Sequence, residues 1–200
     1  AAQPDLVVMD RDENPKAVHD WCIANGFPTF VCHVRHPSEV PSMLRELGKA
    51  VERSDAAEAH AQAVERALLA APVTGERTGL PLIWLKPLMA ANGTTYAGNM
   101  LACAGFSVPD IEPDGTGYPE VTPEIIVENG VTDVFLSSEP HEFTNEEGES
   151  LAEAFRALTD APPDIHFIDG EDLTWMGTRT AEALERLSQR LNDVAGRAVS

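Results

Sequence analysis

Residues 4–34 read PDLVVMDRDENPKAVHDWCIANGFPTFVCHV, and this stretch decides the fold class. Leu6–Met9 is a continuous apolar run of the kind found in strands that are buried on both faces. Asn14-Pro15 predicts the start of a helix with the asparagine as its N-cap, and Asn25-Gly26 predicts its end. Phe27–Val34 predicts a second strand, so the stretch is a strand–helix–strand unit.

The same alternation of strands and helices continues after residue 34. Ser38 is predicted to cap a helix that runs to about Val51, and Ser54 starts a longer, alanine-rich helix that runs to about Ala71. Small residues around most of the second helix suit close packing against structural elements on two of its sides. Residues 72–80, rich in Pro, Thr and Gly, predict a connector. Further strands are predicted at residues 81–85, 134–137 and 165–168. Further helices are predicted at residues 95–104 and 122–129, and another begins at residue 145. A last helix is predicted before the C-terminus, where one apolar stripe is formed by Leu184, Leu187, Leu191 and Val194.

This pattern predicts an α/β protein with two lobes of parallel sheet, covered by helices and joined by one long helix. Residues 1–53 are expected to form a partial N-terminal lobe, residues 54–74 a connecting backbone helix, and residues 75–200 a C-terminal lobe with a terminal helix. Two strands are a poor basis for an independently stable sheet. We therefore expect an incomplete first lobe, which either lacks its beginning or is completed by a second copy in a homodimer.

The composition restricts the partners of the chain. Of its 200 residues, 33 are acidic and 14 are basic, so the formal net charge is -19. Such a surface repels phosphate backbones and argues against nucleic acid as a partner. No apolar run approaches the length of about 20 residues that a membrane span requires. Cys22, Cys32 and Cys103 are an odd number without a CxxC pair, and we predict that all three are unpaired.

In open parallel α/β sheets, ligands bind outside the carboxyl ends of the strands. That rule selects five loops, at residues 10–14, 33–38, 86–94, 138–144 and 169–178. These loops, with the start of the helix that follows the third one, contain side chains that neither a core nor an ordinary surface requires. The candidate ligand-binding residues are His33, His36, Lys86, Met89, Tyr96, Glu139, His141 and Trp175.

Two pairs among these residues allow other interpretations. His33 and His36 could ligate a metal through neutral imidazole nitrogens, although no third ligand stands at a motif spacing. Glu139 and His141 could form an acid–base pair. The sequence supplies neither a nucleophile elbow nor a triad partner, and hydrogen bonding within the loop is the more ordinary role.

The tryptophans are expected to differ in their surroundings. Trp84 lies within a predicted strand and is expected in the core, whereas Trp175 lies beside Met176 and Gly177 and is expected to line a cleft. The glycines form no dinucleotide-binding fingerprint, and a Walker A motif is absent from the sequence.

Five segments match, in order, the motifs of one known family. Gln3–Val8 resembles its "KPDLVI" strand, and Ile83–Met89 resembles the "IWRxPWM" strand end of a subgroup. Asn92–Gly98 is similar to the helix start "GRDTYAGD", Ser137–Phe143 to "SSEPYPF", and Asp169–Gly177 to "DGxxLTWYG". The chain thus resembles, along essentially its whole length, the cobalamin and iron-siderophore substrate-binding proteins of ABC importers, the helical-backbone metal receptor group.

The resemblance implies a non-catalytic protein of two α/β lobes joined by one long helix, with the ligand held between the lobes. It implies a corrinoid, an iron-siderophore or a related metal chelate as the ligand, no further cofactor, and an ABC transporter permease as a partner. It also implies an extracytoplasmic location, or a cytoplasmic one if the chain belongs to the subgroup whose members often lack a signal peptide.

The chain departs from the family pattern in three respects. Leu85 replaces an arginine and Met176 replaces a tyrosine, so the identity of the ligand is not carried over. Family members begin with a further strand–helix–strand stretch, which this chain lacks.

The alternative function is that of a metal-binding protein or metal-dependent enzyme that uses His33, His36, Glu139 and His141. A third possibility is a structural fragment that dimerises through its incomplete sheet.

Overall fold

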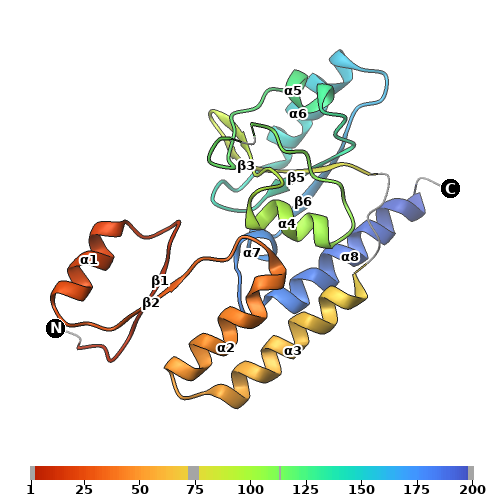
Figure 1. Ribbon diagram of the computed structural model, residues 1–200. Coiled ribbons are helices and arrows are strands. Elements are labelled where there is room, and N and C mark those ends of the chain that lie inside the picture. Colours follow the sequence, from red (N-terminus) through yellow and green to blue (C-terminus); the bar gives the residue numbers. More distant parts are fainter. Residues whose placement is uncertain (1–2, 72–76, 113, 198–200) are drawn as a thin grey trace.

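Two sheets organise the part of the chain that the computed structural model describes, residues 3–71, 77–112 and 114–197 (Figure 1). The first sheet pairs β1 (Val7–Asp10) in parallel with β2 (Thr29–Cys32). The second sheet has the strand order β4-β3-β5-β6. Helices cover its parallel strands, so the predicted α/β class with two lobes of parallel sheet is confirmed.

The first lobe is thinner than the sequence predicts. Its two strands are joined by α1 (Lys16–Ala24), and Met9 and Cys22 are buried between strand and helix. Val8 and Val31, in contrast, are about half exposed, so the expectation of strands buried on both faces is wrong for this sheet. The physical reason is that a single helix covers only one face of a sheet, and none of the described elements covers the other.

The loop that follows β1 uses its asparagine differently from the prediction. The Asn14 side-chain oxygen accepts a hydrogen bond from the Asp10 backbone N–H at 2.8 Å, and Pro15 occupies the N-cap position of α1 without a side-chain bond. Asn14 therefore closes the loop onto the strand end and does not cap the helix. The predicted end is confirmed, because Gly26 adopts a φ of +76° that a residue with a side chain rarely adopts.

Two antiparallel helices, α2 (Val40–Ala50) and α3 (Ser54–Ala70), follow a 3₁₀ turn, η1 (Pro37–Glu39). His36, and not Ser38, caps this turn, because its Nδ1 accepts from the Ser38 backbone N–H at 3.1 Å. Arg45 of α2 bridges Glu58 and Glu65 of α3 at 2.7 Å each. The opposite side of α3 packs against α8 (Thr180–Arg197), as small residues around a helix favour (Figure 1).

The second lobe contains β3 (Gly79–Leu85), β4 (Leu88–Ala90), β5 (Asp133–Ser137) and β6 (Asp164–Ile168). β3, β5 and β6 are parallel, and the unpredicted β4 runs antiparallel to β3. All five residues of β5 are buried, as a central parallel strand requires. β3 begins at Gly79, inside the predicted connector, of which residues 72–76 lie outside the described chain.

Two hydrophobic clusters sandwich this sheet. α4 (Tyr96–Cys103), the unpredicted α7 (Gly170–Thr174) and α8 cover one face, and α5 (Pro123–Glu128) and α6 (Asn145–Leu158) cover the other. Leu184 and Leu187 of the predicted terminal stripe are buried, whereas the side chains of Leu191 and Val194 lie outside the described part. None of the described helices combines the length and the apolar character needed to cross a membrane.

Candidate ligand-binding cleft

Three large aromatic side chains stand exposed on the carboxyl-end side of the second sheet. The exposed fractions are 41% for Trp84, 40% for Tyr118 and 50% for Trp175. They come from the end of β3, from the segment that pairs with β4, and from the end of α7. We call these three residues the aromatic band. Trp175 was among the candidates from the sequence, whereas Trp84 and Tyr118 were not.

Trp84 projects from the strand end instead of into the core, so the prediction of a core tryptophan is wrong. The pairing of β3 with β4 shifts register between Leu82 and Trp84, and such a bulge re-aims the side chain that follows it. The Trp84 indole N–H donates to the backbone oxygen of Lys86 at 3.1 Å. His141 lies edge-on to the indole, with ring centroids 5.9 Å apart. The loop after β5 therefore contacts the end of β3.

α7, which ends directly before Trp175, contacts the same loop. The Thr174 hydroxyl donates to the Glu139 carboxylate at 3.1 Å, and the Gly170 backbone N–H donates to the Ser138 hydroxyl at 2.9 Å. A Cβ on Gly170 would collide with Glu139, so only a glycine lets α7 approach so closely. The loops after β5 and β6 thus lie side by side, as their position at the carboxyl ends of neighbouring strands predicts.

A cationic side chain of the same protein lies over the Trp175 ring. The Arg179 guanidinium lies 5.4 Å from the ring centroid, and it also forms an ion pair with Glu171. Arg179 therefore covers one face of the indole, while half of the Trp175 surface remains exposed to solvent.

Glu139 and His141 do not form an acid–base pair. His141 Nε2 lies 3.2 Å from the Glu147 carboxylate, and its ring packs edge-on against Phe143 at 4.7 Å. Hydrogen bonds from the Thr144 backbone N–H and from His141 hold the pKa of Glu147 below its ordinary value. Glu139 instead accepts from Thr174. Both candidates lie beside the aromatic band, but each is engaged with a different partner.

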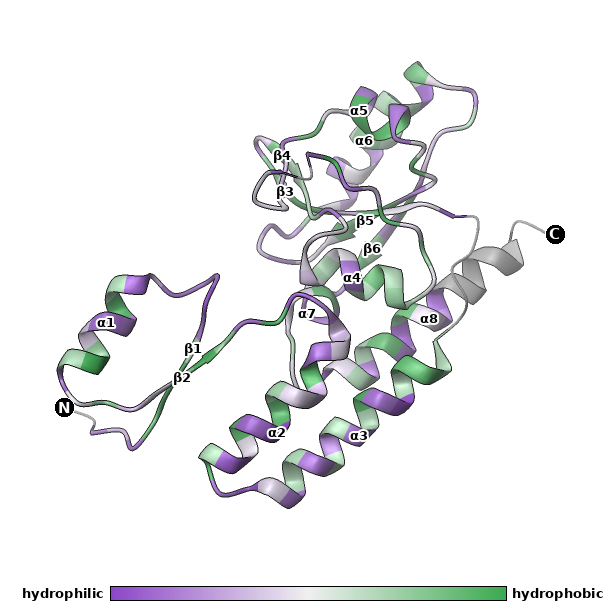
Figure 2. Cartoon of the chain, in the orientation of Figure 1, coloured by the Kyte–Doolittle hydropathy of each residue, from purple (hydrophilic) through white to green (hydrophobic). Residues whose placement is uncertain are grey.

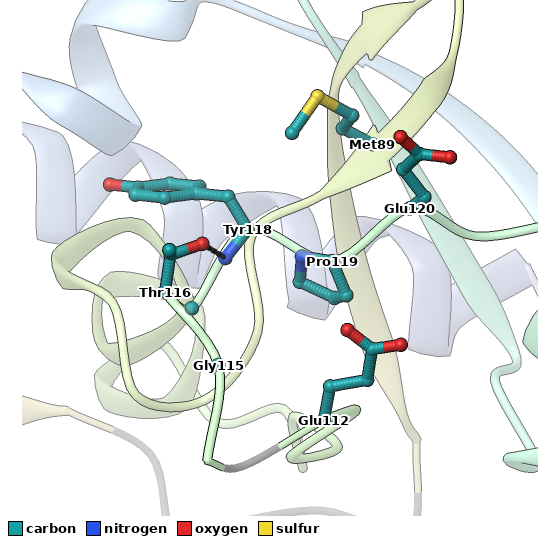
Figure 3. Close-up of a pocket in the computed structure, with 8 residues that line it drawn as sticks. Met89, Glu112, Gly115, Thr116, Tyr118, Pro119 and Glu120 are labelled. Carbon is teal, nitrogen blue, oxygen red and sulfur yellow. Dashed lines mark hydrogen bonds between the residues drawn. The ribbon is translucent and has the colours of Figure 1, made fainter.

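A hollow of about 420 Å³ continues the band beyond β4. Met89, Thr116, Tyr118, Pro119 and two glutamates are among its lining residues (Figure 3). Met89 pairs with Trp84 across the β3–β4 hairpin and with Glu120 on its other side, which joins the hollow to the band. The signal for Tyr118 in the sequence is an aromatic residue next to Gly117 in a loop dense in proline and glycine.

The acidic loop of the first lobe lies close enough to Tyr118 to affect its ionisation. Burial and then the negative charges of Asp12 and Glu13 raise the pKa of Tyr118. Asp10 accepts hydrogen bonds from the backbone N–H groups of Asp12 and Glu13, at 2.8 and 3.1 Å, and fixes this hydrophilic loop (Figure 2). His33 borders the same loop, with its Nδ1 4.0 Å from the Asp12 carboxylate. The charges of the first-lobe loop thus reach Tyr118, whereas the hollow itself is lined by residues of the second lobe.

Two candidates belong to the packing and not to the cleft surface. Tyr96 is buried in the first turn of α4, and its hydroxyl lies 2.8 Å from the Thr180 hydroxyl. Burial raises the pKa of Tyr96 to about 12. His36 contacts the Ser38 hydroxyl at 2.8 Å and the Cys103 sulfur at 3.9 Å. Lys86, in contrast, is exposed at the strand end beside Trp84.

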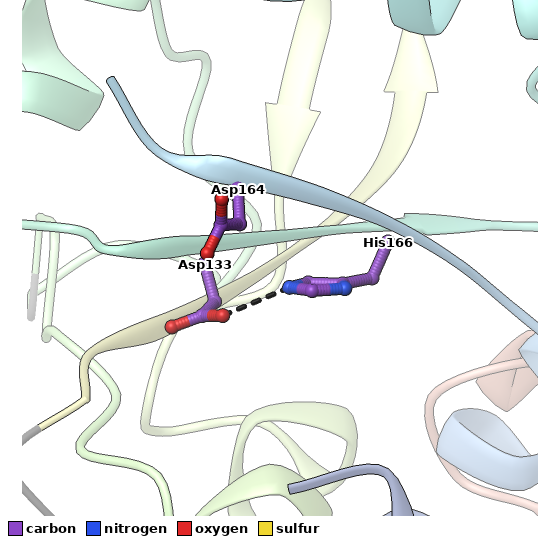
Figure 4. Close-up of side chains that lie close together, drawn as sticks. All are labelled: Asp133, Asp164 and His166. Atoms are coloured by element: carbon purple, nitrogen blue, oxygen red, sulfur yellow. Dashed lines mark hydrogen bonds and ion pairs between the residues drawn. The ribbon is translucent and has the colours of Figure 1, made fainter. Parts of the chain in front are cut away.

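The four residues of the alternative metal site do not converge. Among the described residues, the group of ligand atoms close enough for a metal is Asp133, Asp164 and His166 (Figure 4), which contains none of His33, His36, Glu139 and His141. This group lies at the amino ends of β5 and β6, away from the carboxyl-end loops. Arg77 donates to Asp133 at 2.6 Å and to Asp164 at 2.7 Å, so a guanidinium already supplies the positive charge there.

The cysteines are free, as predicted. Cys22 is buried, and Cys32 and Cys103 are partly buried. Burial raises the pKa of the Cys32 and Cys103 thiols, so neither is an activated nucleophile.

No protein-family model and no curated protein matches the chain. Solved structures do match. The periplasmic heme-binding protein RhuT from Roseiflexus sp. RS-1 superimposes with a TM-score of 0.72 at 20% identity, over 96% of this chain and 77% of RhuT. The periplasmic vitamin B12-binding protein BtuF of Vibrio cholerae gives 0.70 at 16% identity, over 94% and 74%. An ABC-type Fe3+-hydroxamate transport protein from Saccharomonospora viridis gives 0.67 at 18% identity, over 93% and 68%.

These matches establish the fold. The chain has the two-lobe α/β architecture of these binding proteins, as its resemblance to the cobalamin and siderophore family predicts.

Proposed function

We propose that the protein is a non-catalytic binding protein for a metal chelate, such as a corrinoid, an iron-siderophore or a related complex. The observation that carries this proposal is the aromatic band of Trp84, Tyr118 and Trp175, exposed at the carboxyl-end loops of the sheet. It is supported by the names of the structural neighbours, which include binding proteins for vitamin B12 and heme and an Fe3+-hydroxamate transport protein.

A planar macrocycle or compact chelate suits such a band because its binding relies mostly on burial of apolar surface. Flat aromatic faces offer a large contact area, and a few polar groups at the rim fix the orientation. Lys86, Glu139 and His33 are the candidates for the polar rim, because Lys86 and Glu139 lie beside the band and His33 borders the acidic loop of the first lobe. Glu139 and His141 are each engaged with other partners, which favours a binding role over an acid–base role.

The proposal includes a partner and a location. The chelate would be passed to the permease of an ABC importer, and the protein would act outside the cytoplasm. The neighbours that are described as periplasmic support this location. A homodimer that completes the first-lobe sheet belongs to the same proposal, because β1 and β2 form a sheet with no further described strand.

Calorimetric titration with vitamin B12, heme and a ferric hydroxamate tests the proposal. At least one of these chelates should bind, and Trp175→Ala should weaken that binding. Loss of a buried aromatic contact of about 1.5–3 kcal/mol corresponds to a loss of about tenfold to hundredfold in affinity. The matched control is Trp21→Ala, which removes another indole that is at least half exposed, from α1 and outside the aromatic band.

Binding of none of the three chelates by the folded protein would refute the proposed function. Equal losses of affinity in Trp175→Ala and Trp21→Ala would refute the proposed site, because the effect would then not depend on the position of the indole.

A further inference from the structure

The loops that border the cleft carry more negative than positive charge. The carboxylates are supplied by both lobes, whereas the bases are few. Arg179 is already paired with Glu171. The acidic residues of these loops are Asp10, Asp12, Glu13, Asp110, Glu112, Asp114, Glu120, Glu139, Glu142, Asp169, Glu171 and Asp172, and the basic ones are Arg11, Arg35, Lys86 and Arg179.

Glu112 and Glu120 line the hollow itself, on the two sides of Pro119 (Figure 3). Both are exposed. Neither takes part in an ion pair within residues 3–71, 77–112 and 114–197. Their charges are therefore available to a bound molecule.

The acidic loop of the first lobe adds to the same field. Beyond the effect of burial, the carboxylates of Asp12, Glu13 and Asp10 raise the pKa of Tyr118, and Arg35 offsets this effect only in part. With a net charge of -19, the remainder of the chain does not compensate this local charge. Charges of one sign that line a cleft with low-dielectric walls reinforce one another and concentrate counter-ions.

The aromatic band favours the same sign of charge. The faces of Trp and Tyr rings are electron-rich and attract cations. One ring of the band already demonstrates this preference, because the Arg179 guanidinium lies 5.4 Å from the centroid of Trp175. Tyr118 of the aromatic band thus lines the hollow of about 420 Å³ together with the unpaired carboxylates of Glu112 and Glu120.

We propose that this cleft selects metal chelates that carry a net positive charge and disfavours chelates with several negative charges. The inference rests on the proposed function, since it specifies the charge of the chelate that the cleft binds. An anionic chelate would face repulsion from Glu112 and Glu120, whereas a cationic one would neutralise them without loss of the apolar contact with the band.

Pairs of chelates that differ in charge but hardly in shape test the inference. Aquacobalamin carries a positive charge that cyanocobalamin lacks, and ferrioxamine B carries an ammonium group that its N-acetylated derivative lacks. Heme, with two propionates, is the anionic probe. In titrations at low salt, the cationic member of at least one pair should bind about tenfold more tightly, and the difference should shrink in 0.5 M salt because salt screens exposed charges.

Two double variants assign the preference to the hollow. Glu112→Gln with Glu120→Gln should reduce the preference for the cationic member by at least about threefold, since two of the nearby charges are removed. The control is Glu153→Gln with Glu185→Gln, on α6 and α8, which changes the net charge equally but does not touch the hollow. The control should keep the preference.

The outcomes separate the two proposals. Equal affinity within both pairs, tighter binding of heme than of every cationic probe, or an equal effect of the two double variants overturns the inference and leaves the proposed function standing. Failure of every probe to bind, neutral ones included, overturns the proposed function itself and the inference with it.

Discussion

At the scale of single residues, Asp133 is a buried ionisable group of the second lobe with several hydrogen-bond partners. Its side chain is fully buried at the start of β5, where it accepts hydrogen bonds from Arg77 at 2.6 Å and lies 2.8 Å from His166 Nε2. Burial alone would raise its pKa, but the hydrogen bonds from His166 and Arg77 outweigh that effect and lower the pKa of Asp133 from 3.8 to about 2. The group therefore holds the amino ends of β3, β5 and β6 together.

This arrangement predicts acid sensitivity. A carboxyl whose pKa is lower in the folded state stabilises the fold above its ordinary pKa, and that stabilisation is lost as the pH falls through the folded value. For Asp133 the window runs from about pH 4 to about pH 2, and the loss is about 2 kcal/mol. Urea unfolding measured across this window should show the loss in the native protein and a smaller one in Asp133→Asn.

The same variant should be strongly destabilised at neutral pH. Removal of one partner of a buried ion pair costs about 3 kcal/mol, because Arg77 is left without its main partner. Asp164→Asn is the matched control, since Asp164 bonds the same guanidinium but its side chain is 63% exposed. Exposed pairs contribute at most about 1 kcal/mol. Equal losses of unfolding free energy in the two variants would contradict the structural role of Asp133.

At the scale of elements, α6 begins with a capping box that also positions the loop of the candidate site. The Thr144 hydroxyl accepts from the Glu147 backbone N–H at 3.2 Å, and the Glu147 carboxylate accepts from the Thr144 backbone N–H at 2.8 Å. The same carboxylate lies 3.2 Å from His141. The start of the helix thus fixes the loop that contacts Trp84.

Thr144→Ala should lower the unfolding free energy by about 1 kcal/mol, because an N-cap hydroxyl is lost. Ser150→Ala is the control in the same helix, since its hydroxyl only donates to the Glu146 backbone oxygen on the exposed surface. That change should stay within about 0.5 kcal/mol. Chemical denaturation of both variants measures the difference, and a larger loss in Ser150→Ala would refute the capping role.

At the scale of the whole molecule, the two lobes are very unequal. The first lobe exposes five large apolar side chains on a unit of three short elements: Val8, Val18, Trp21, Ile23 and Val31. The second lobe has apolar clusters on both faces of its sheet. Exposed apolar strands and open sheet edges favour association.

Light scattering should therefore show the mass of a dimer for this chain. Val31→Lys should give a monomer, because a charge on β2 opposes pairing of that face. Leu69→Lys is the control, since it places the same charge on an almost fully exposed leucine of α3, and it should leave the dimer intact. A stable monomer of the native chain with a cooperative thermal transition would contradict the prediction.

The sequence by itself determined the alternation of strands and helices and the side of the sheet on which the candidate loops lie. Both follow from local properties: the periodicity of apolar residues sets each element, and chain direction in a parallel sheet places the loops at one edge. Gly26 marks the end of α1 for an equally local reason. The resemblance to the chelate-binding family anticipated the fold that the structural neighbours share.

Only the tertiary structure decided which side chains form the cleft. Trp84 turns outward because of a bulge against β4, a strand that the sequence did not predict, and Tyr96 turns inward to reach Thr180, which is 84 residues away. Tyr118 feels the charge of Asp12, which is more than 100 residues away in the chain, so the first-lobe loop reaches the neighbourhood of this ring. The placements of Tyr96 and Tyr118 depend on packing between segments far apart in the chain, and the pattern of neighbouring residues carries no information about such packing. The placement of Trp84 depends on a hairpin partner that the apolar pattern does not reveal.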